Sequence, residues 1–112
     1  MGVQTNTQVT QEILEEFKER MHITHNSEDS NLQRLLSFSV HSLQRKCGPF
    51  DINEHEGAKE LVFERTRYAY NDAIEYFEDN FLSEITSLGI DLLSEETDET
   101  TTTTTTTTKS GV

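Results

Sequence analysis

The chain has 112 residues, of which 32% are hydrophobic and 27% charged, and its net charge at pH 7 is −12. A chain of this length is expected to form one domain that buries only about 60–65% of its unfolded surface, so contacts with other subunits would add stability. The acidic charge disfavours direct binding to nucleic-acid phosphates, although it lets DNA pass nearby without sticking.

The cysteine content and the hydropathy of the chain indicate synthesis and folding in a reducing compartment. Cys47 is the single cysteine, so no internal disulfide is expected. No apolar run resembles a signal peptide or approaches the length of a membrane span. Asn6 stands where a myristoylation signal needs Ser or Thr. We therefore expect a soluble protein made in the cytoplasm, with no membrane partner.

The first helix is predicted to run from about residue 11 to residue 20 or 21, after a flexible arm over residues 1–8. Thr10 is a suitable N-cap, and Val9 with Leu14 forms a hydrophobic staple. The predicted core residues of this helix are Ile13, Leu14 and Phe17.

A polar turn, HNSEDSN, leads into the second helix. Asn26 with Asp29, or Ser27 alone, is expected to cap its first turn. The basic residues before Gly48, and Pro49 after it, predict the end of this helix. Its predicted core residues are Leu32, Leu35, Leu36, Val40 and Leu43.

The longest helical pattern covers residues 57–88 and has no proline, and no glycine after Gly57. It predicts one long helix on which the first two helices pack, with Asn53 and Glu56 as its capping pair. Gly89 is the expected end, and residues 79–80 are the most favourable place for an earlier break. The predicted core residues here are Leu61, Val62, Ala69, Ala73, Phe77 and Phe81.

Several apolar residues fall outside this core pattern. Tyr68 and Tyr70 lie off the main stripe, and a second group at the end of the pattern comprises Ile85, Leu88, Ile90, Leu92 and Leu93. Because exposed apolar segments mark interfaces, these residues are predicted to form a contact surface, with packing inside the core as the open alternative.

At Ser94 the composition changes to an acidic, Thr-rich tail over residues 94–112, which is expected to be disordered because it has nothing large to bury. The predicted helical domain therefore covers residues 9–93. Its fold class is all-α: a small bundle of three to four helices with one long C-terminal helix.

No catalytic or nucleotide-binding motif occurs in the sequence. Glu19 and His22 form an ExxH pair and His22 with His25 an HxxH pair, but a di-iron site needs a second ExxH, and zinc needs three or four ligands. Cys47 has no visible activating base and is interpreted as a small apolar residue. The sequence thus predicts no enzyme, no catalytic residue, no metal site and no cofactor.

The helix order, together with the segments ILEEFKERMHIT, HNSEDSN, LQRLLSFSVHSLQRKCG and RYAYNDAIEYFEDNF, resembles the small head–tail connector (adaptor, or head-completion) proteins of tailed bacteriophages. The resemblance covers about residues 12–85 and is greatest to connectors of siphophages from Gram-positive hosts. It implies a structural virion protein without enzymatic activity or cofactor. Such a protein forms a ring of about twelve copies beneath the portal, which extends the DNA channel and joins the DNA-filled head to the neck and tail.

The partners that this resemblance implies are the portal protein, further copies of the chain itself and the next neck or tail-completion protein. DNA is implied only as cargo that passes through the channel. The implied location is the virion neck at the head–tail interface, after assembly in the host cytoplasm. In this family the C-terminal part tends to contact the portal, which by position implicates Ile85, Leu88, Ile90, Leu92 and Leu93.

Two other functions remain open at this level. A small acidic adaptor or regulatory protein would bind a phage or host partner through the same apolar C-terminal segment without forming a ring. A helix–turn–helix regulator over residues 10–46 is disfavoured, because its second helix offers few cations to a DNA groove: Arg34, Arg45 and Lys46.

Overall fold

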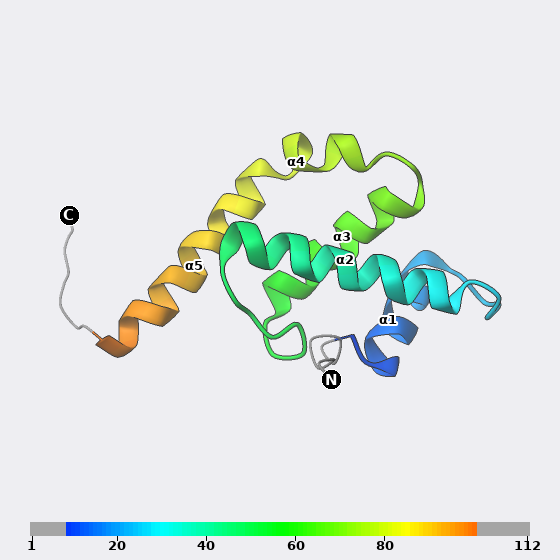
Figure 1. Ribbon diagram of the computed structural model, residues 1–112, viewed down its shortest axis with the longest axis horizontal. Helices are drawn as coiled ribbons and strands as arrows, with labels where there is room; N and C mark the ends of the chain where they lie inside the picture. Colours follow the sequence, from blue (N-terminus) through cyan, green and yellow to red (C-terminus); the bar gives the residue numbers. More distant parts are fainter. Residues whose placement is uncertain (1–8, 101–112) are drawn as a thin grey trace.

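The computed structural model describes the backbone of residues 9–100 and the side chains of residues 9–94. This part of the chain is all-helical, without a strand, which confirms the predicted class. The elements are α1 (Gln11–Met21), α2 (Asp29–Cys47), α3 (Glu56–Tyr70), the 3-10 turn η2 (Ile74–Tyr76), α4 (Phe77–Asn80) and α5 (Leu82–Thr100) (Figure 1). The predicted N-terminal arm, and the tail from residue 101, lie outside the described residues.

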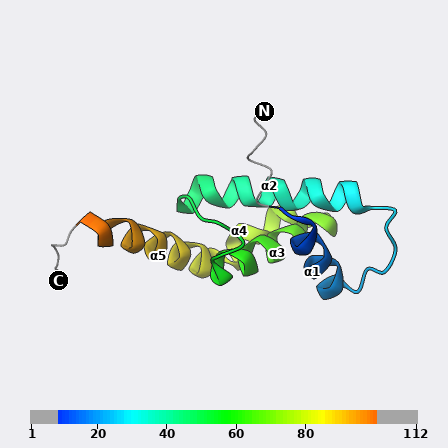
Figure 2. The ribbon, with the colours of Figure 1, turned by 90° about the horizontal axis from the view of Figure 1, so that it is seen from below.

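Helix α2 is the element on which the others pack. It contacts α1, α3 and α5, and Lys46 near its C-terminal end forms an ion pair with Glu78 of α4. In Figure 2, α2 forms one layer, and α1, α3 and α5 form a second layer beneath it. Among the described residues, no helix has the length and apolar character that crossing a bilayer requires.

Helix α1 begins as the sequence predicts. Thr10 Oγ1 accepts a hydrogen bond from the Ile13 amide at 3.2 Å, which confirms Thr10 as the N-cap. Val9 and Leu14, the two residues of the predicted staple, are both buried. The local sequence therefore fixes both the start of this helix and the side that it turns towards the core.

A Schellman motif ends α1. The Ile23 amide donates to the Lys18 carbonyl at 2.8 Å, and the His22 amide donates to the Glu19 carbonyl at 3.1 Å. His22 occupies the left-handed position, with a φ of 62°. This places His22 outside the helix and leaves its side chain exposed.

The turn between α1 and α2 is held by a buried lysine. Lys18 Nζ donates to Asn26 Oδ1 and to Asp29 Oδ1, each at 2.7 Å, and only 5% of the Lys18 side chain is exposed. Asn26 and Asp29 therefore bind the ammonium group and do not cap α2, whose N-cap residue Glu28 makes no capping bond through its side chain. The predicted cap is wrong, because a buried charge needs partners more than an exposed helix end does.

The end of α2 and the start of α3 enclose a short apolar loop. Helix α2 ends at Cys47, and Gly48 follows with a φ of 114°, as the glycine at this position predicts. Phe50 and Ile52 then enter the core. The N-cap of α3 is His55, whose Nδ1 accepts from the Ala58 amide at 3.1 Å, so the capping pair predicted from Asn53 and Glu56 is wrong.

The single helix predicted over residues 57–88 is interrupted after α3. The Asp72 amide donates to the Ala69 carbonyl at 3.1 Å, and the Ala73 amide donates to the Tyr68 carbonyl at 2.8 Å. Asp72 has a φ of 59°. These bonds form a second Schellman motif, in which an aspartate takes the place that glycine usually occupies.

A second interruption follows at Phe81, between α4 and α5. The break expected at residues 79–80 is therefore displaced by one residue. Helix α5 passes through Gly89, the predicted end, and continues beyond the predicted domain boundary at residue 93 to Thr100. The chain thus folds back over α3 instead of extending as one rod, which brings α5 against α2 and α3.

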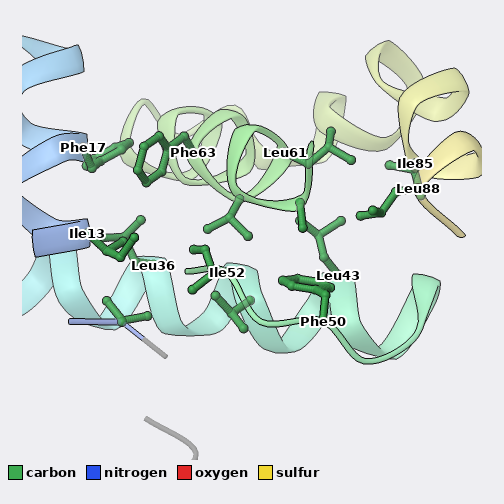
Figure 3. Packing of buried hydrophobic residues seen from close by; sticks show 14 of the residues in the cluster. Ile13, Phe17, Leu36, Leu43, Phe50, Ile52, Leu61, Phe63, Ile85 and Leu88 are labelled. Carbon is green, nitrogen blue, oxygen red and sulfur yellow. The ribbon is translucent and has the colours of Figure 1, made fainter. Parts of the chain in front are cut away.

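The core lies between the two layers. Figure 3 shows Phe17 of α1 facing Phe63 of α3, with their ring centroids 5.5 Å apart, and Ile85 and Leu88 of α5 closing the far end. The predicted core residues that are buried are Ile13, Leu14, Phe17, Leu32, Leu36, Val40, Leu43, Leu61, Val62 and Phe77. Those that are only half-buried are Leu35, Ala69, Ala73 and Phe81.

Candidate interaction surface

The structure divides the predicted contact residues of the C-terminal segment into two groups. Ile85, Leu88 and Leu92 are buried within the chain, so for these three residues the structure favours the open alternative, packing inside the core. The reason is the reversal of chain direction before α5, which lays this side of the helix on α2 and α3. Ile90 and Leu93 lie on the opposite side and are 60% and 61% exposed.

Tyr68 and Tyr70 make contacts within the chain. The Tyr68 ring lies edge-on to Phe77 at 5.8 Å and to Phe81 at 5.7 Å, measured between ring centroids. The Tyr70 hydroxyl donates to Glu28 Oε2 at 3.0 Å, and this bond raises the pKa of Tyr70. Both tyrosines are half-buried, so the structure gives them a role in joining α3 to its neighbours and not in a free apolar surface.

The exposed side of α5 combines apolar and acidic residues. Leu82, Ile90 and Leu93 are each about three-fifths exposed. Ile90 and Leu93 line a groove against the end of α2, whereas the exposed carboxylates of Glu84 and Asp91 line a groove on the flank of α5 that faces α3. Figure 1 shows α5 passing the C-terminal end of α2 and running away from the other helices. An apolar surface on a projecting helix is characteristic of a binding surface. We call the exposed residues Glu84, Ile90, Asp91 and Leu93 the α5 surface.

An acidic groove of about 580 Å³ separates α5 from the first half of α3. Its carboxylates come from Glu60 and Glu64 of α3 and from Glu84 and Asp91 of α5. Arg20 binds both α3 carboxylates, at 2.7 Å to Glu60 and 3.3 Å to Glu64. The free negative charge of the groove therefore lies mainly on its α5 side.

Sequence reasoning missed a cationic surface on the opposite side of α3. Arg34, Phe38, His41 and Arg45 lie on one side of α2 because they are spaced by four, three and four residues. All four are exposed, and Phe38 is 59% exposed. A groove of about 530 Å³ runs between this side of α2 and α3, where Arg65 lines it. We call these five residues the α2 cationic surface.

The charges of this surface are not neutralised by carboxylates in contact with them. Among the described side chains, Lys18, Arg20, Lys46, Lys59 and Arg67 each form an ion pair with Asp or Glu, whereas Arg34, Arg45 and Arg65 form none. Three arginines without such a pair on one surface are unusual in a chain with a net charge of −12, where carboxylates outnumber cations. The helical spacing of the basic residues would have revealed the α2 part of it, but not its meeting with Arg65.

Arg65 is positioned by a polar chain between α2 and α3. Its Nη1 donates to Ser39 Oγ at 3.2 Å, and Ser39 Oγ lies 3.0 Å from the buried Thr66 Oγ1, which donates to the Val62 carbonyl at 2.7 Å. Burial lowers the pKa of Arg65; the charge of Glu78 opposes this shift, and Arg45 nearby acts in the same direction as burial. The guanidinium group is thus held in a partly desolvated site where a carboxylate would stabilise it.

The residues weighed for chemistry do not come together. His25 Nδ1 lies 2.9 Å from Ser27 Oγ, while His22 points to solvent beyond the end of α1. No group of three or more potential metal ligands is found among the residues that the structure describes. Cys47 Sγ donates to the Ile85 carbonyl at 3.4 Å, and burial raises the pKa of its thiol, which is the reverse of what a nucleophile needs.

Comparison of the chain with known proteins gives no match among family models, curated proteins or solved structures. The surfaces described above are therefore the basis on which its function is argued.

Proposed function

We propose that this chain is a structural protein of a bacteriophage neck, which forms a ring beneath the portal, extends the DNA channel and joins the filled head to the next neck or tail component. The sequence resemblance to head–tail connectors motivates the proposal. The all-helical fold over residues 9–100 is compatible with it. Its partners would be the portal protein, other copies of the chain and the next neck protein, with DNA as passing cargo and the virion neck as its location.

The observation that carries the proposal is the α5 surface. Helix α5 leaves the body of the protein with Ile90 and Leu93 exposed to solvent. Exposure of these apolar side chains to water is unfavourable, and a partner that buries them would gain binding free energy. The contact that the resemblance assigns to the portal falls on this helix. Because Leu92 is buried, the contact would use Ile90 and Leu93 and leave Leu92 in the core.

The experiment is to mix the purified chain with the portal of the same phage and to examine the particles by negative-stain electron microscopy. The proposal predicts a portal that is longer by one collar-like tier. The double variant Ile90→Asp/Leu93→Asp is expected to lose this tier while retaining its circular dichroism spectrum, because both side chains are exposed. Ser87→Asp is the matched control, since it adds charge at an exposed position of the same helix.

An unchanged portal beside free monomeric protein would refute the connector function. The alternative is then a small acidic adaptor that binds another phage or host protein through the α5 surface. In that case a pull-down with the wild-type chain recovers a partner that the Ile90→Asp/Leu93→Asp variant does not.

A further inference from the structure

Two surfaces of this chain have complementary chemistry and do not meet within one copy. The α2 cationic surface carries three arginines without a carboxylate in contact, grouped around the exposed ring of Phe38. On α5, the exposed carboxylates of Glu84 and Asp91 lie on the flank that faces α3, whereas Ile90 and Leu93 lie on the flank that faces the end of α2. The charge of the acidic flank is the one that the cationic surface lacks.

The two charged surfaces each extend over about two to three helical turns. From Arg34 to Arg45 the surface extends over eleven residues of α2, or roughly 16 Å at 1.5 Å per residue. From Glu84 to Asp91 the carboxylates extend over seven residues of α5, or roughly 10 Å.

Within one chain the two surfaces are kept apart by the fold. Asp91 lines the groove on the Glu60 side of α3, whereas Arg65 lines the groove on the other side of that helix. Among the side chains that the structure describes, no carboxylate of α5 forms an ion pair with α2, and Lys46 of α2 instead binds Glu78 of α4 at 2.6 Å. Helix α5 also runs away from α2 beyond their contact (Figures 1 and 2). The acidic helix can therefore reach a cationic surface only on another molecule.

We propose that the α2 cationic surface of one copy binds the acidic flank of α5, formed by Glu84 and Asp91, of a second copy. This inference rests on the proposed function, because it names the contact by which copies of the chain would form the ring. Arg34 and Arg45 would pair with these carboxylates, and Arg65 would bind the carboxylate that reaches into the groove. Ile90 and Leu93 line a separate groove on the other flank of α5 and would remain available to the portal.

Such a contact is heterologous, since two different surfaces meet. One copy then keeps its acidic surface and the other its cationic surface, so a further copy can add at either side, and the assembly closes as a ring when the rotation between copies permits. A two-fold arrangement, in which the cationic surface of each copy meets the acidic surface of the other, would instead stop at a dimer. Contacts between two cationic surfaces, or between two acidic ones, are disfavoured by charge repulsion.

The test is cross-linking between two distinguishable copies in a Cys47→Ser background. One copy carries a size tag and Ser37→Cys, next to Phe38 in the α2 groove, and the other carries Ser87→Cys on the exposed side of α5. A short bismaleimide is added to the free proteins at high concentration and also to the portal-bound tier. The expected result is a mixed product that neither variant gives alone. Ser27→Cys, in the exposed turn before α2, is the matched control and should give no mixed product.

Charge reversal makes the test specific for the proposed pairs. Arg34→Glu/Arg45→Glu in the tagged copy should lower the yield of mixed product at least about tenfold, because like charges then face each other. Glu84→Arg/Asp91→Arg in the other copy should restore it. These side chains are exposed, so each variant is expected to keep the wild-type circular dichroism spectrum and urea midpoint.

Three results would overturn the inference. The first is the lack of a mixed product in both samples, and the second is equal product from each variant alone. The third is a labelled DNA duplex that binds the wild type but not Arg34→Glu/Arg45→Glu, which would assign the cationic surface to phosphate. A portal with an added tier but no mixed product would leave the connector function standing and refute this contact alone.

Discussion

Leu92 and Leu93 offer a direct test of how α5 packs. They are adjacent in sequence and identical in chemistry, but Leu92 is 6% exposed and Leu93 is 61% exposed. Leu92 lies against the C-terminal end of α2, where its Cβ would be 3.8 Å from a Cβ built on Gly48. Replacing each leucine in turn with alanine compares a core position with a surface position one residue away.

The expected cost of Leu92→Ala is about 2–3 kcal/mol of unfolding free energy. Transfer of a leucine side chain from water to the core contributes roughly 1.5–3 kcal/mol, and the cavity left behind adds to this. The value falls at the low end of the range for leucine-to-alanine changes because Leu92 lies at the edge of the core, where the site can relax. Leu93→Ala should change the free energy of unfolding by less than about 0.5 kcal/mol.

Urea denaturation followed by far-UV circular dichroism measures both variants. With a slope of about 1–1.5 kcal/mol per molar urea for a domain of this size, Leu92→Ala should lower the midpoint by roughly 2 M. Such a loss is a large part of the total stability expected for a small domain. Equal midpoints for the two variants would refute the burial of α5 against α2, and the order of their midpoints would be reversed if the helix were rotated about its axis.

Three further predictions concern the core, the buried lysine and the cysteine. Phe77→Ala should lower the free energy of unfolding by about 3–5 kcal/mol in the same urea assay, because Phe77 is 1% exposed. Tyr76→Ala, at the exposed neighbouring position, should change it little. Similar losses for the two variants would contradict the aromatic packing. Lys18→Ala and Asp29→Ala should be non-additive by about 0.5–3 kcal/mol in a double-mutant cycle, and additive losses would argue against the 2.7 Å pair. Burial raises the pKa of the Cys47 thiol above its ordinary value of 9.0, so alkylation at pH 8 should be slower than that of free cysteine. The alkylation rate should increase as the pH rises through the raised pKa of the folded protein. Over the same pH range the protein loses the stability that the protonated thiol contributes. Alkylation as fast as that of free cysteine would show that the thiol is exposed.

Much of the first half of the fold was predictable because its determinants are local. The cap at Thr10 and the apolar spacing of α1 and α2 involve residues within one or two turns of each other, and the glycine after α2 ends that helix through its own backbone. The second half was less predictable. Asn71 and Asp72 end α3 without glycine or proline, and the only local indication was that both residues are common in turns.

The candidate interaction surface was also only partly predictable from the sequence. Its residues were recognised as apolar and outside the main stripe, but α5 is apolar on more than one side, and periodicity alone does not tell which side is covered. The choice between Leu92 and Leu93 depends on the reversal before α5, which is a property of the whole chain. The α2 cationic surface was missed for a related reason, because Arg65 joins Arg34 and Arg45 only when α2 and α3 lie side by side.

The sequence alone determined that the described chain is helical, where α1 begins, where α2 ends and, apart from Leu35, which apolar residues of these two helices form the core, because hydrogen bonds and apolar spacing within a helix act over a few residues. The tertiary structure decided where the predicted long helix breaks, which side of α5 is buried and why Asn26 and Asp29 bind Lys18 instead of capping α2. These outcomes depend on which distant groups compete for the same side chain or cover the same surface, and that competition exists only once the helices are packed.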